Sequence, residues 1–415
     1  MPTVSFVSLG CPKNLVDSEK MLGLLAEAGC AIVGDGEADV MVVNTCGFLA
    51  ESRNEALEIL REAADRKRNE QIGRLVVAGC LVQRDGRGLL KEVPEIDALL
   101  GVHNRRDIVR AVTGTTPGEM RRTDAESVPP ADDHDGRLLF LGEYHAGSWI
   151  DANRSDRVRL RLTPSHTAYL RVGEGCDQKC TFCTIPSIRG PMHCKTIDEI
   201  MAEARELIAD GAVEINLIGQ DTTSFGRDIG YEPGLAGLLR TLNTLDGVIW
   251  LRLMYAYPSD FTDEMIDAIA DCKRIAKYID IPLQHINDRV LRAMHRRVTR
   301  KQTESLLSRL RDRIPGVTIR TTFISGFPSE TDAEHAELRS FIEDFGFDML
   351  GVFPYSSEPG TPAHSMKNPI PAGVIETRVE DLMLTQQAVA FRKAAARKGE
   401  QFRVMIDDYG ENGVY

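Results

Sequence analysis

Residues 169–190 read YLRVGEGCDQKCTFCTIPSIRG and hold Cys176, Cys180 and Cys183 in a C-x₃-C-x₂-C run. A β-rich segment, 167–172, leads into this run. Because disulfide pairing of three cysteines leaves one thiol over, the spacing favours a metal or an iron–sulfur cluster. Three cysteines hold three irons of a [4Fe–4S] cube and leave the fourth iron open to a small molecule that carries amino and carboxylate groups.

Two other interpretations fit the same spacing. A structural zinc ion needs a fourth ligand, and His193 or Cys194 stands close enough in the sequence to supply it. Three buried cysteines without any metal are the third interpretation. The spacing alone ranks the cluster above zinc, and zinc above simple packing.

Length and composition describe a globular chain with room for two or three domains, since its 415 residues are 42 % hydrophobic and 27 % charged. The sequence shows no membrane-spanning apolar run and no signal peptide. Nine cysteines without an export signal predict a reducing compartment, the cytoplasm. The net charge of −12 favours a basic partner over bare nucleic acid.

The N-terminal segment, 1–115, alternates strand and helix and therefore predicts a parallel-sheet α/β domain. Cys11, Cys46 and Cys80 each follow the end of an expected strand. Because the carboxyl ends of parallel strands share one sheet edge, these thiols are predicted to converge on a second cluster site. The alternative is three buried structural cysteines. The expected strands are 3–9, 39–43 and 74–78, and the expected helices are 15–28 and 52–66.

Residues 116–160 are rich in Gly, Pro, Asp and Thr and read as a linker, with a short strand in 138–144 leading into the next domain. The segment 161–397 alternates strand and helix again, which predicts an open, partial (β/α)₆ barrel. Its expected strands are 167–172, 214–218, 250–254, 278–282, 318–324 and 348–353; its expected helices are 197–209, 235–245, 263–269, 288–294, 301–313 and 332–345.

Sites on such barrels lie at the carboxyl ends of the strands. Those ends carry Gln220-Asp221-Thr222, Tyr255, Tyr257, Gln284-His285, Ser325-Gly326-Phe327-Pro328 and Tyr355-Ser356. An ordinary strand-to-helix turn also explains Gly326 and Pro328, and a lone histidine such as His285 is more often structural. Arg189 either orients a ligand or shapes the loop. We interpret Cys30, Cys194 and Cys272 as packing residues.

A long helix is expected over 371–398, and 398–415 reads as a strand and a turn. This last segment resembles the first hairpin of a small β-barrel that stops before it closes, so we expect the chain to be cut there.

The C-x₃-C-x₂-C run, with Phe182 just before its last cysteine, resembles the radical S-adenosylmethionine (AdoMet) enzymes. With the dispersed N-terminal cysteines, the chain resembles the radical AdoMet methylthiotransferases over nearly its whole length. Their order is an N-terminal domain, the barrel, and a C-terminal β-barrel called TRAM. The resemblance implies AdoMet and two [4Fe–4S] clusters, an auxiliary one on Cys11, Cys46 and Cys80 and a radical one on Cys176, Cys180 and Cys183. The expected AdoMet contacts are Phe182, Gln220, Gly326 and Pro328.

Four short sequence motifs resemble those of the RimO branch: SLGCPKNLVDSE, NTCGFLAES, GCLVQR and EGCDQKCTFCTIPSIRG. That branch adds a methylthio group to an aspartate β-carbon of ribosomal protein S-twelve, with one AdoMet as methyl donor and one as radical source. The implied partners are that protein and an electron donor such as flavodoxin or ferredoxin. The alternatives are a MiaB-type tRNA adenosine methylthiotransferase and a zinc-binding RNA module without catalysis. Pro12-Lys13 and Gly47-Phe48 depart from the MiaB pattern.

Overall fold

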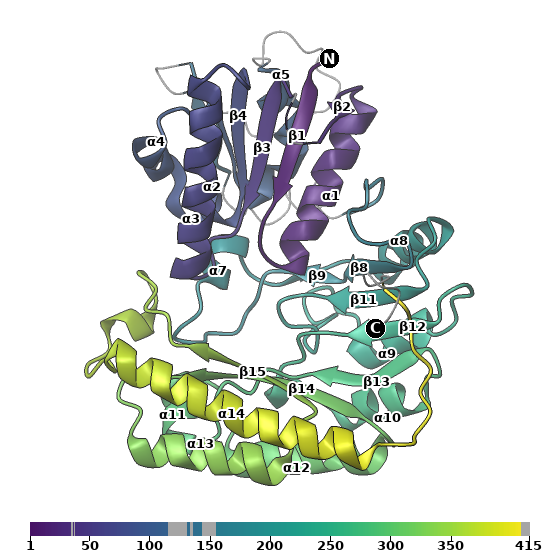
Figure 1. Ribbon diagram of the computed structural model, residues 1–415. Coiled ribbons are helices and arrows are strands. Elements are labelled where there is room, and N and C mark those ends of the chain that lie inside the picture. Colours follow the sequence, from purple (N-terminus) through teal and green to yellow (C-terminus); the bar gives the residue numbers. More distant parts are fainter. Residues whose placement is uncertain (35, 37, 115–130, 133–135, 143–154, 408–415) are drawn as a thin grey trace. The chain divides into compact units, whose positions relative to one another are not determined.

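The computed structural model describes residues 1–407 except 35, 37, 115–130, 133–135 and 143–154 (Figure 1). Contacts between residues divide the chain into two compact units. The first unit holds 1–162, 171–178 and 183–203, and the second holds 163–170, 179–182 and the chain from 204 onward. Cys176 and Cys183 are thereby assigned to the first unit and Cys180 to the second.

The first unit is built on a seven-stranded sheet with the order β2-β1-β3-β4-β5-β7-β6. All neighbouring pairs run parallel except β6 with β7. The strands are β1 (Thr3–Ser8), β2 (Ala31–Ile32), β3 (Val40–Thr45), β4 (Arg74–Gly79), β5 (Ala98–Leu100), β6 (Ala131–Asp132) and β7 (Leu138–Phe140).

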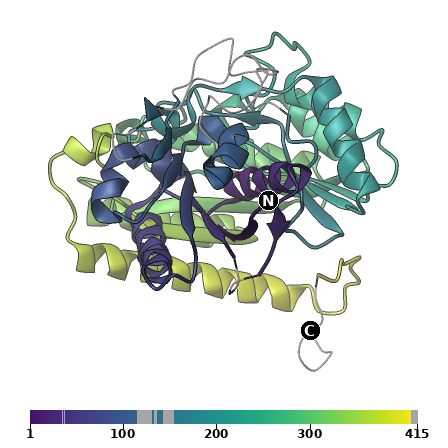
Figure 2. The same ribbon diagram turned by 90° about the horizontal axis from the view of Figure 1, so that it is seen from above.

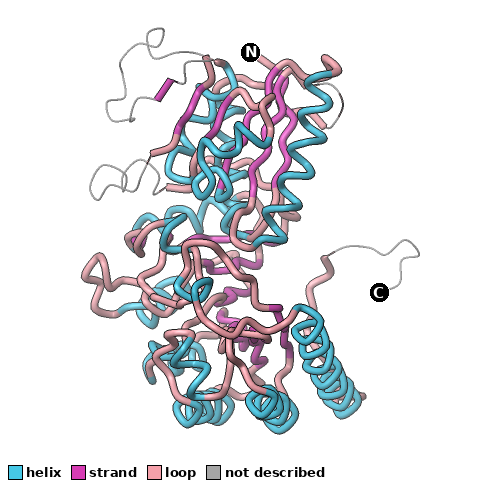
Figure 3. Tube along the Cα trace, turned by 90° about the vertical axis from the view of Figure 1, so that its left-hand side faces the viewer, coloured by secondary structure: helices cyan, strands magenta, loops and turns pink. Residues whose placement is uncertain are grey.

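Helices cover both faces of this sheet, as Figure 3 shows. Because side chains alternate along a strand, neighbouring residues of β3 enter different cores. Val40 and Val42 pack with α1 (Pro12–Glu27) and α5 (Ile108–Thr113), whereas Met41 and Val43 pack with α2 (Ala50–Arg68). The remaining helical segments are α3 (Cys80–Asp85), η1 (Gly86–Gly88), α4 (Leu89–Glu92) and η2 (Val102–Asp107).

The expected strands and helices of the N-terminal domain are confirmed. The elements that were not expected there are β2, β5, α3, α4, α5 and the short helical turns η1 and η2. The strand within 138–144 was expected to lead into the next domain, which is wrong. Leu138, Leu139 and Phe140 pair with β5 and extend the first sheet, because three buried apolar residues need a sheet neighbour and a core. Most of the expected linker lies outside the described residues.

The second unit is built on a six-stranded sheet with the order β15-β14-β13-β12-β11-β8. Since β8 and β15 are the two edges, the sheet stays open, in agreement with the expected partial barrel. Its strands are β8 (Thr167–Arg171), β11 (Glu214–Ile218), β12 (Trp250–Leu253), β13 (Ile275–Asp280), β14 (Thr318–Ser325) and β15 (Met349–Pro354).

Helices alternate with these strands, and threonine caps fix where several of them begin. Thr299 and Thr331 each form a capping box with the residue three positions on, which satisfies the first N–H groups of the helix. The helical segments are α8 (Ile197–Ala209), α9 (Gly234–Leu242), η3 (Pro258–Asp260), α10 (Asp263–Asp271), α11 (Asp288–Ala293), α12 (Arg300–Arg313), α13 (Asp332–Phe345), η4 (Pro362–Ser365) and α14 (Ala372–Ala396).

The C-terminal helix α14 confirms the expected long helix, which Figure 2 shows along its length in yellow. It runs beside β15 and α13 (Figure 1). The strand expected in 398–415 is not present in its described part, since 401–407 adopt neither helix nor strand. The other residues of that segment, 408–415, lie outside the described residues. No helix in the described part of the chain has the length and apolar character needed to cross a membrane.

Candidate functional site

Cys11, Cys46 and Cys80 lie where the sequence places them. Cys11 directly precedes α1 in the connection from β1, Cys46 follows β3, and Cys80 begins α3 directly after β4. Because β1, β3 and β4 are neighbouring parallel strands, all three cysteines lie at one edge of the first sheet. Their predicted position is confirmed, and their binding of a cluster stays a prediction.

Two glycines let the cysteine loops approach one another. A Cβ atom on Gly10 would lie 2.7 Å from Cβ of Cys46, and one on Gly47 would lie 3.1 Å from the carbonyl carbon of Cys80. Any larger residue at either position would push the loops apart. The glycines therefore hold the three thiols as one group, which we call the auxiliary site.

Burial dominates the electrostatics of the auxiliary site. Cys80 is 5 % exposed, and burial raises the pKa of its thiol to about 12 against the opposing effect of Arg189. Burial also raises the pKa of Cys46. A metal with a positive charge offsets this penalty, because cysteine binds metals as the thiolate.

Arg189 of α7 (Ile185–Arg189) is the basic residue at this site, because its Nη2 lies 3.2 Å from Sγ of Cys80. The same guanidinium donates to Asp17 and Glu174. These residues belong to a larger set of buried, ion-paired side chains of the first unit, which we call the charge network. Its members are Asp17, Arg105, Asp156, Arg171, Glu174, Arg189, Lys195 and Glu203.

The segment that follows β8 is held by a short antiparallel pair, β9 (Gly173–Glu174) with β10 (His193–Cys194). At the start of the cysteine run, the N–H of Cys176 donates to the carbonyl of Gly190 over 3.1 Å. At its end, the N–H of Ile185 lies 3.4 Å from Sγ of Cys183. Both outer cysteines are thus tied to the first unit.

The zinc interpretation finds no support in this geometry. His193 and Cys194 are both buried in β10. Across the described residues, no three His, Cys, Asp or Glu side chains are arranged to hold a single metal ion. A [4Fe–4S] cube differs from a single ion, because each thiolate binds a separate iron.

Cys180 belongs to the second unit and faces two residues from separate loops, one after β12 and one after α11. Its Sγ lies 3.9 Å from the hydroxyl of Tyr257 and 3.7 Å from Nη1 of Arg296. The Arg296 guanidinium lies over the Tyr257 ring, 4.0 Å from its centroid. Sequence reasoning found Tyr257 from its place after β12, but it missed Arg296, which follows α11 with no local pattern.

Two expected AdoMet contacts have surroundings that suit a binding role. Phe182 packs against buried residues of the second unit that include Met294 and Phe327, which fixes the loop beside Cys180. Gln220 follows β11, and both its side-chain amide atoms are buried without a hydrogen-bond partner among the described residues. A buried amide without partners is rare, because desolvation then goes uncompensated. A bound ligand could supply the hydrogen-bond partners that the Gln220 amide lacks among the described residues.

Gly326, Pro328 and His285 have structural explanations. Gly326 has φ +82°, and a Cβ there would lie 2.4 Å from Cγ1 of Ile375 in α14, so packing alone requires glycine. Pro328 is buried in the turn that follows. Burial lowers the pKa of His285 to about 3, and its Nδ1 accepts the N–H of Asn287.

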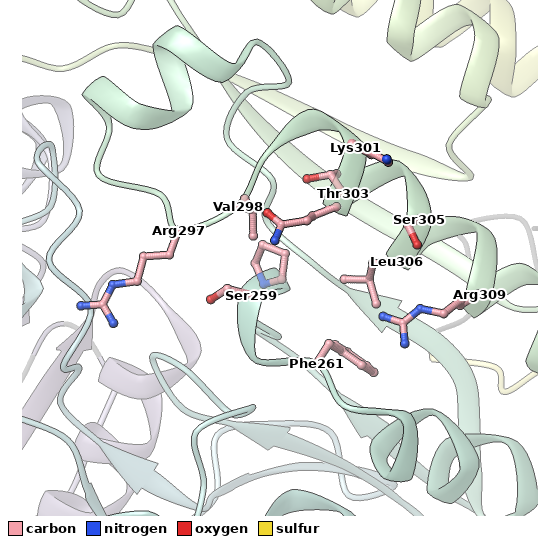
Figure 4. Close-up of a pocket in the computed structure, with 11 residues that line it drawn as sticks. Ser259, Phe261, Arg297, Val298, Lys301, Thr303, Ser305, Leu306 and Arg309 are labelled. Atoms are coloured by element: carbon pink, nitrogen blue, oxygen red, sulfur yellow. The ribbon is translucent and has the colours of Figure 1, made fainter.

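A pocket of about 340 Å³ lies in the second unit between η3 and α12 (Figure 4). None of the residues expected to bind a cofactor lines it. Its basic residues are Arg297, Lys301 and Arg309, of which Arg309 pairs with Asp263. The pocket therefore has no share in the predicted cofactor sites. All nine cysteines are within the described residues, and none forms a disulfide.

Comparison with known proteins identifies two family models along the chain. The model of "Uncharacterized protein family UPF0004" matches residues 3–101, and that of the Radical SAM superfamily matches 170–342. The chain is 41 % identical to the "Ribosomal protein uS12 methylthiotransferase RimO" of Desulforamulus reducens, over 100 % of the chain and 89 % of that relative. It is 42 % identical to the protein of the same name from Anaeromyxobacter sp., over 97 % of the chain and 81 % of the relative.

Solved structures resemble the chain in fold. The radical S-adenosylmethionine methyltransferase TsrM from Kitasatospora setae, solved with cobalamin and a [4Fe–4S] cluster bound, superposes with a TM-score of 0.60 at 15 % identity, over 88 % of this chain and 77 % of that one. The cobalamin-dependent S-adenosylmethionine radical enzyme OxsB gives 0.56 at 13 % identity, over 93 % and 56 %. At such identities the likeness shows the α/β architecture.

Proposed function

Because the chain belongs to the family of the ribosomal protein uS12 methylthiotransferases RimO, we propose that it adds a methylthio group to the β-carbon of an aspartate of uS12. One AdoMet would serve as methyl donor and one as radical source. The observation that carries the proposal is the auxiliary site, three dispersed thiols at one sheet edge of a chain that also holds the C-x₃-C-x₂-C run. The tRNA methylthiotransferase and the zinc-binding module are not favoured, because the relatives carry the RimO name.

We infer that Cys11, Cys46 and Cys80 hold one [4Fe–4S] cluster and that Cys176, Cys180 and Cys183 hold the other. When bound, the clusters supply an electron for AdoMet cleavage and a place for sulfur. The auxiliary site fits such a group, because its thiols are soft ligands, its glycines keep the loops together, and Arg189 offsets negative charge.

The protein's own residues would position the reactants. Phe182 keeps the loop of Cys180 packed against the second unit, and Tyr257 with Arg296 orients the sulfur of that cysteine. Gln220 offers AdoMet one donor and one acceptor from its buried amide. Backbone groups near Gly326 and Pro328 would complete the AdoMet contacts. Removing hydrogen from an unactivated carbon lies beyond general acid–base catalysis, so these residues act by position and by exclusion of water.

The roles of the domains form part of the proposal. Residues 1–115 would carry the auxiliary cluster, 116–160 would link, 161–397 would bind AdoMet, and 398–415 would begin a TRAM-like domain. The proposed electron donor is a flavodoxin or a ferredoxin. A cytoplasmic setting suits nine cysteines without a disulfide.

The test compares Cys180→Ala with Cys46→Ala. We expect Cys180→Ala to abolish formation of 5′-deoxyadenosine, and Cys46→Ala to abolish methylthiolation of a uS12 peptide while some AdoMet cleavage remains. Both products are measured by mass spectrometry in anaerobic assays. Cys272→Ala, which changes a buried cysteine outside both sets, is the matched control and should keep both activities.

Iron content provides an independent measure. The wild-type chain should hold about eight irons, and the Cys176/Cys180/Cys183→Ala variant about four. Continued 5′-deoxyadenosine formation by Cys180→Ala, or unchanged methylthiolation by Cys46→Ala, would show that the respective cluster is wrongly assigned.

A further inference from the structure

Arg189 is buried where the charge network meets the auxiliary site. Its side chain is 1 % exposed, so a soluble ligand does not reach the guanidinium in this structure. Its neighbour Ile188 packs with Cys80 and Val102, which fixes the end of α7 against α3. The alternative that Arg189 orients AdoMet is therefore not supported by its position.

The guanidinium of Arg189 is shared between sulfur and carboxylates. Nη2 lies 3.2 Å from Sγ of Cys80 and 2.9 Å from Oδ2 of Asp17, while Nη1 donates to Oε1 of Glu174. An arginine guanidinium stays protonated in proteins, and here the carboxylates of Asp17 and Glu174 pair with it. The group is a permanent cation.

The charge network has equal numbers of cations and carboxylates, but its cation Arg189 is the member that lies beside the sulfur of Cys80. Four cations, three arginines and Lys195, face four carboxylates. Asp17 and Glu174 take up N–H groups of Arg189, so the sulfur of Cys80 meets a donor rather than a carboxylate. Because the site is buried, water and salt screen this interaction weakly.

We propose that Arg189 is a positioning residue of the auxiliary site, which holds the sulfur of Cys80 by a charge-assisted hydrogen bond and raises the reduction potential of the cluster bound there. The inference rests on the proposed function, because it needs a cluster on Cys11, Cys46 and Cys80. Reduction adds negative charge to a cluster, so a nearby cation and hydrogen bonds to its sulfurs favour the reduced state.

The test uses the full-length Cys176/Cys180/Cys183→Ala protein, in which only the auxiliary cluster remains. Arg189→Met and Arg189→Lys are added to it, and reductive titrations are followed by electron paramagnetic resonance. At the wild-type midpoint we expect Arg189→Met to lower the ratio of reduced to oxidised cluster about tenfold, which equals about 59 mV for one electron. Arg189→Lys should lower it less, since lysine keeps the charge but loses the planar fork.

Two double variants separate this effect from general damage to the network. Glu174→Gln/Arg189→Met removes one carboxylate and the cation at Cys80, so it protects the fold from an unpaired buried charge. Lys195→Met/Glu203→Gln also removes one cation and one carboxylate, and these two side chains pair with each other. Only the variants without Arg189 should shift the potential.

The outcomes distinguish this inference from the proposed function. If the parent triple variant binds no iron, the proposed auxiliary cluster is wrong and the inference falls with it. If it binds about four irons but both Arg189→Met variants keep its potential, or the Lys195/Glu203 variant shifts it equally, only the role of Arg189 is refuted. If both Arg189→Met variants lose the cluster while the Lys195/Glu203 variant retains it, the result supports the proposal that Arg189 positions the sulfur of Cys80.

Discussion

Cys80 of the first unit and Cys180 of the second each face a guanidinium, yet the two cations are compensated differently. Arg189 lies 3.2 Å from the sulfur of Cys80 and is surrounded by carboxylates of the charge network. Arg296 lies 3.7 Å from the sulfur of Cys180, stacks on an aromatic ring and donates to a backbone carbonyl.

This difference predicts how each site should respond to the removal of a charged side chain. In the first unit, removing one charge leaves another buried charge without its partner, which is strongly unfavourable. At Cys180, removing the cation leaves no carboxylate of the described residues without its partner, because Arg296 contacts a ring, a carbonyl and a half-buried sulfur. The first unit should therefore be the more sensitive to charge substitutions.

The largest expected effect is on the stability of the first unit. Arg171 is 2 % exposed and pairs with Asp156, Asp17 and Glu174. Arg171→Met should lower the free energy of unfolding by about 3–5 kcal/mol, because it leaves buried carboxylates uncompensated. The measurement is urea unfolding of the full-length chain without iron, followed by circular dichroism.

Two variants control the Arg171 experiment. Arg171→Met/Asp156→Asn should recover part of the loss, since it removes one charge of each sign. In the second unit, Arg289→Met breaks an ion pair with Glu334 whose arginine is largely exposed, and should change stability by about 1 kcal/mol or less. Equal losses for Arg171→Met and Arg289→Met would mean that burial of the network adds nothing.

Acidification should change the stability contributions of two carboxylates in opposite directions, that of Asp156 in the first unit and that of Glu330 in the second. Although burial acts to raise it, Arg171 and Lys195 hold the pKa of Asp156 well below its usual value. Its contribution to stability is thus present above an unfolded pKa near 4 and lost as the pH falls through the folded pKa. Burial raises the pKa of Glu330, so its contribution is present at acid pH and lost as the pH rises through the folded pKa.

Asp156→Asn should accordingly make the loss of stability on acidification shallower, and Glu330→Gln should make it steeper. Urea midpoints between pH 7 and pH 3 measure both slopes against wild type, again on the chain without iron. The same change of slope in both variants would contradict the contrast between an ion-paired carboxylate and one dominated by burial.

Two features of the sequence account for the correct predictions: the alternation of strands and helices, and the position of the cysteines just after expected strands. Cys11, Cys46 and Cys80 are placed correctly, because a parallel sheet brings the carboxyl ends of its strands to one edge whatever the details of packing. The six strands of the second unit follow from the same alternation. The strand Leu138–Phe140 was assigned to the wrong domain, because a three-residue apolar segment indicates a strand but not which strand it pairs with.

The contacts that distinguish the two sites lie beyond such reasoning. Asp17 and Arg189 are 172 positions apart, and neither belongs to a motif that points to the other. Arg296 follows α11 as one of several basic residues, and only the fold brings it to Cys180. Gly326 resembles a ligand-binding glycine in sequence, and the structure adds a packing reason for glycine at this position, the close approach of Ile375 in α14. Long-range pairing of charges carries no local signal.

The smallest expected effect is at Cys180. The Cys11/Cys46/Cys80→Ala protein keeps only the cysteines of the radical cluster. In it, Arg296→Met should lower the ratio of reduced to oxidised cluster at the wild-type midpoint by about threefold, which is less than the effect expected for Arg189→Met at the auxiliary cluster. Cys180 is half-buried, so water already screens part of the charge that Arg296 supplies. Tyr257→Phe keeps the ring under Arg296 and removes only the hydroxyl, and it should shift the potential less still. A shift for Arg296→Met as large as that for Arg189→Met would mean that the burial of the site does not set the effect of the cation on the cluster.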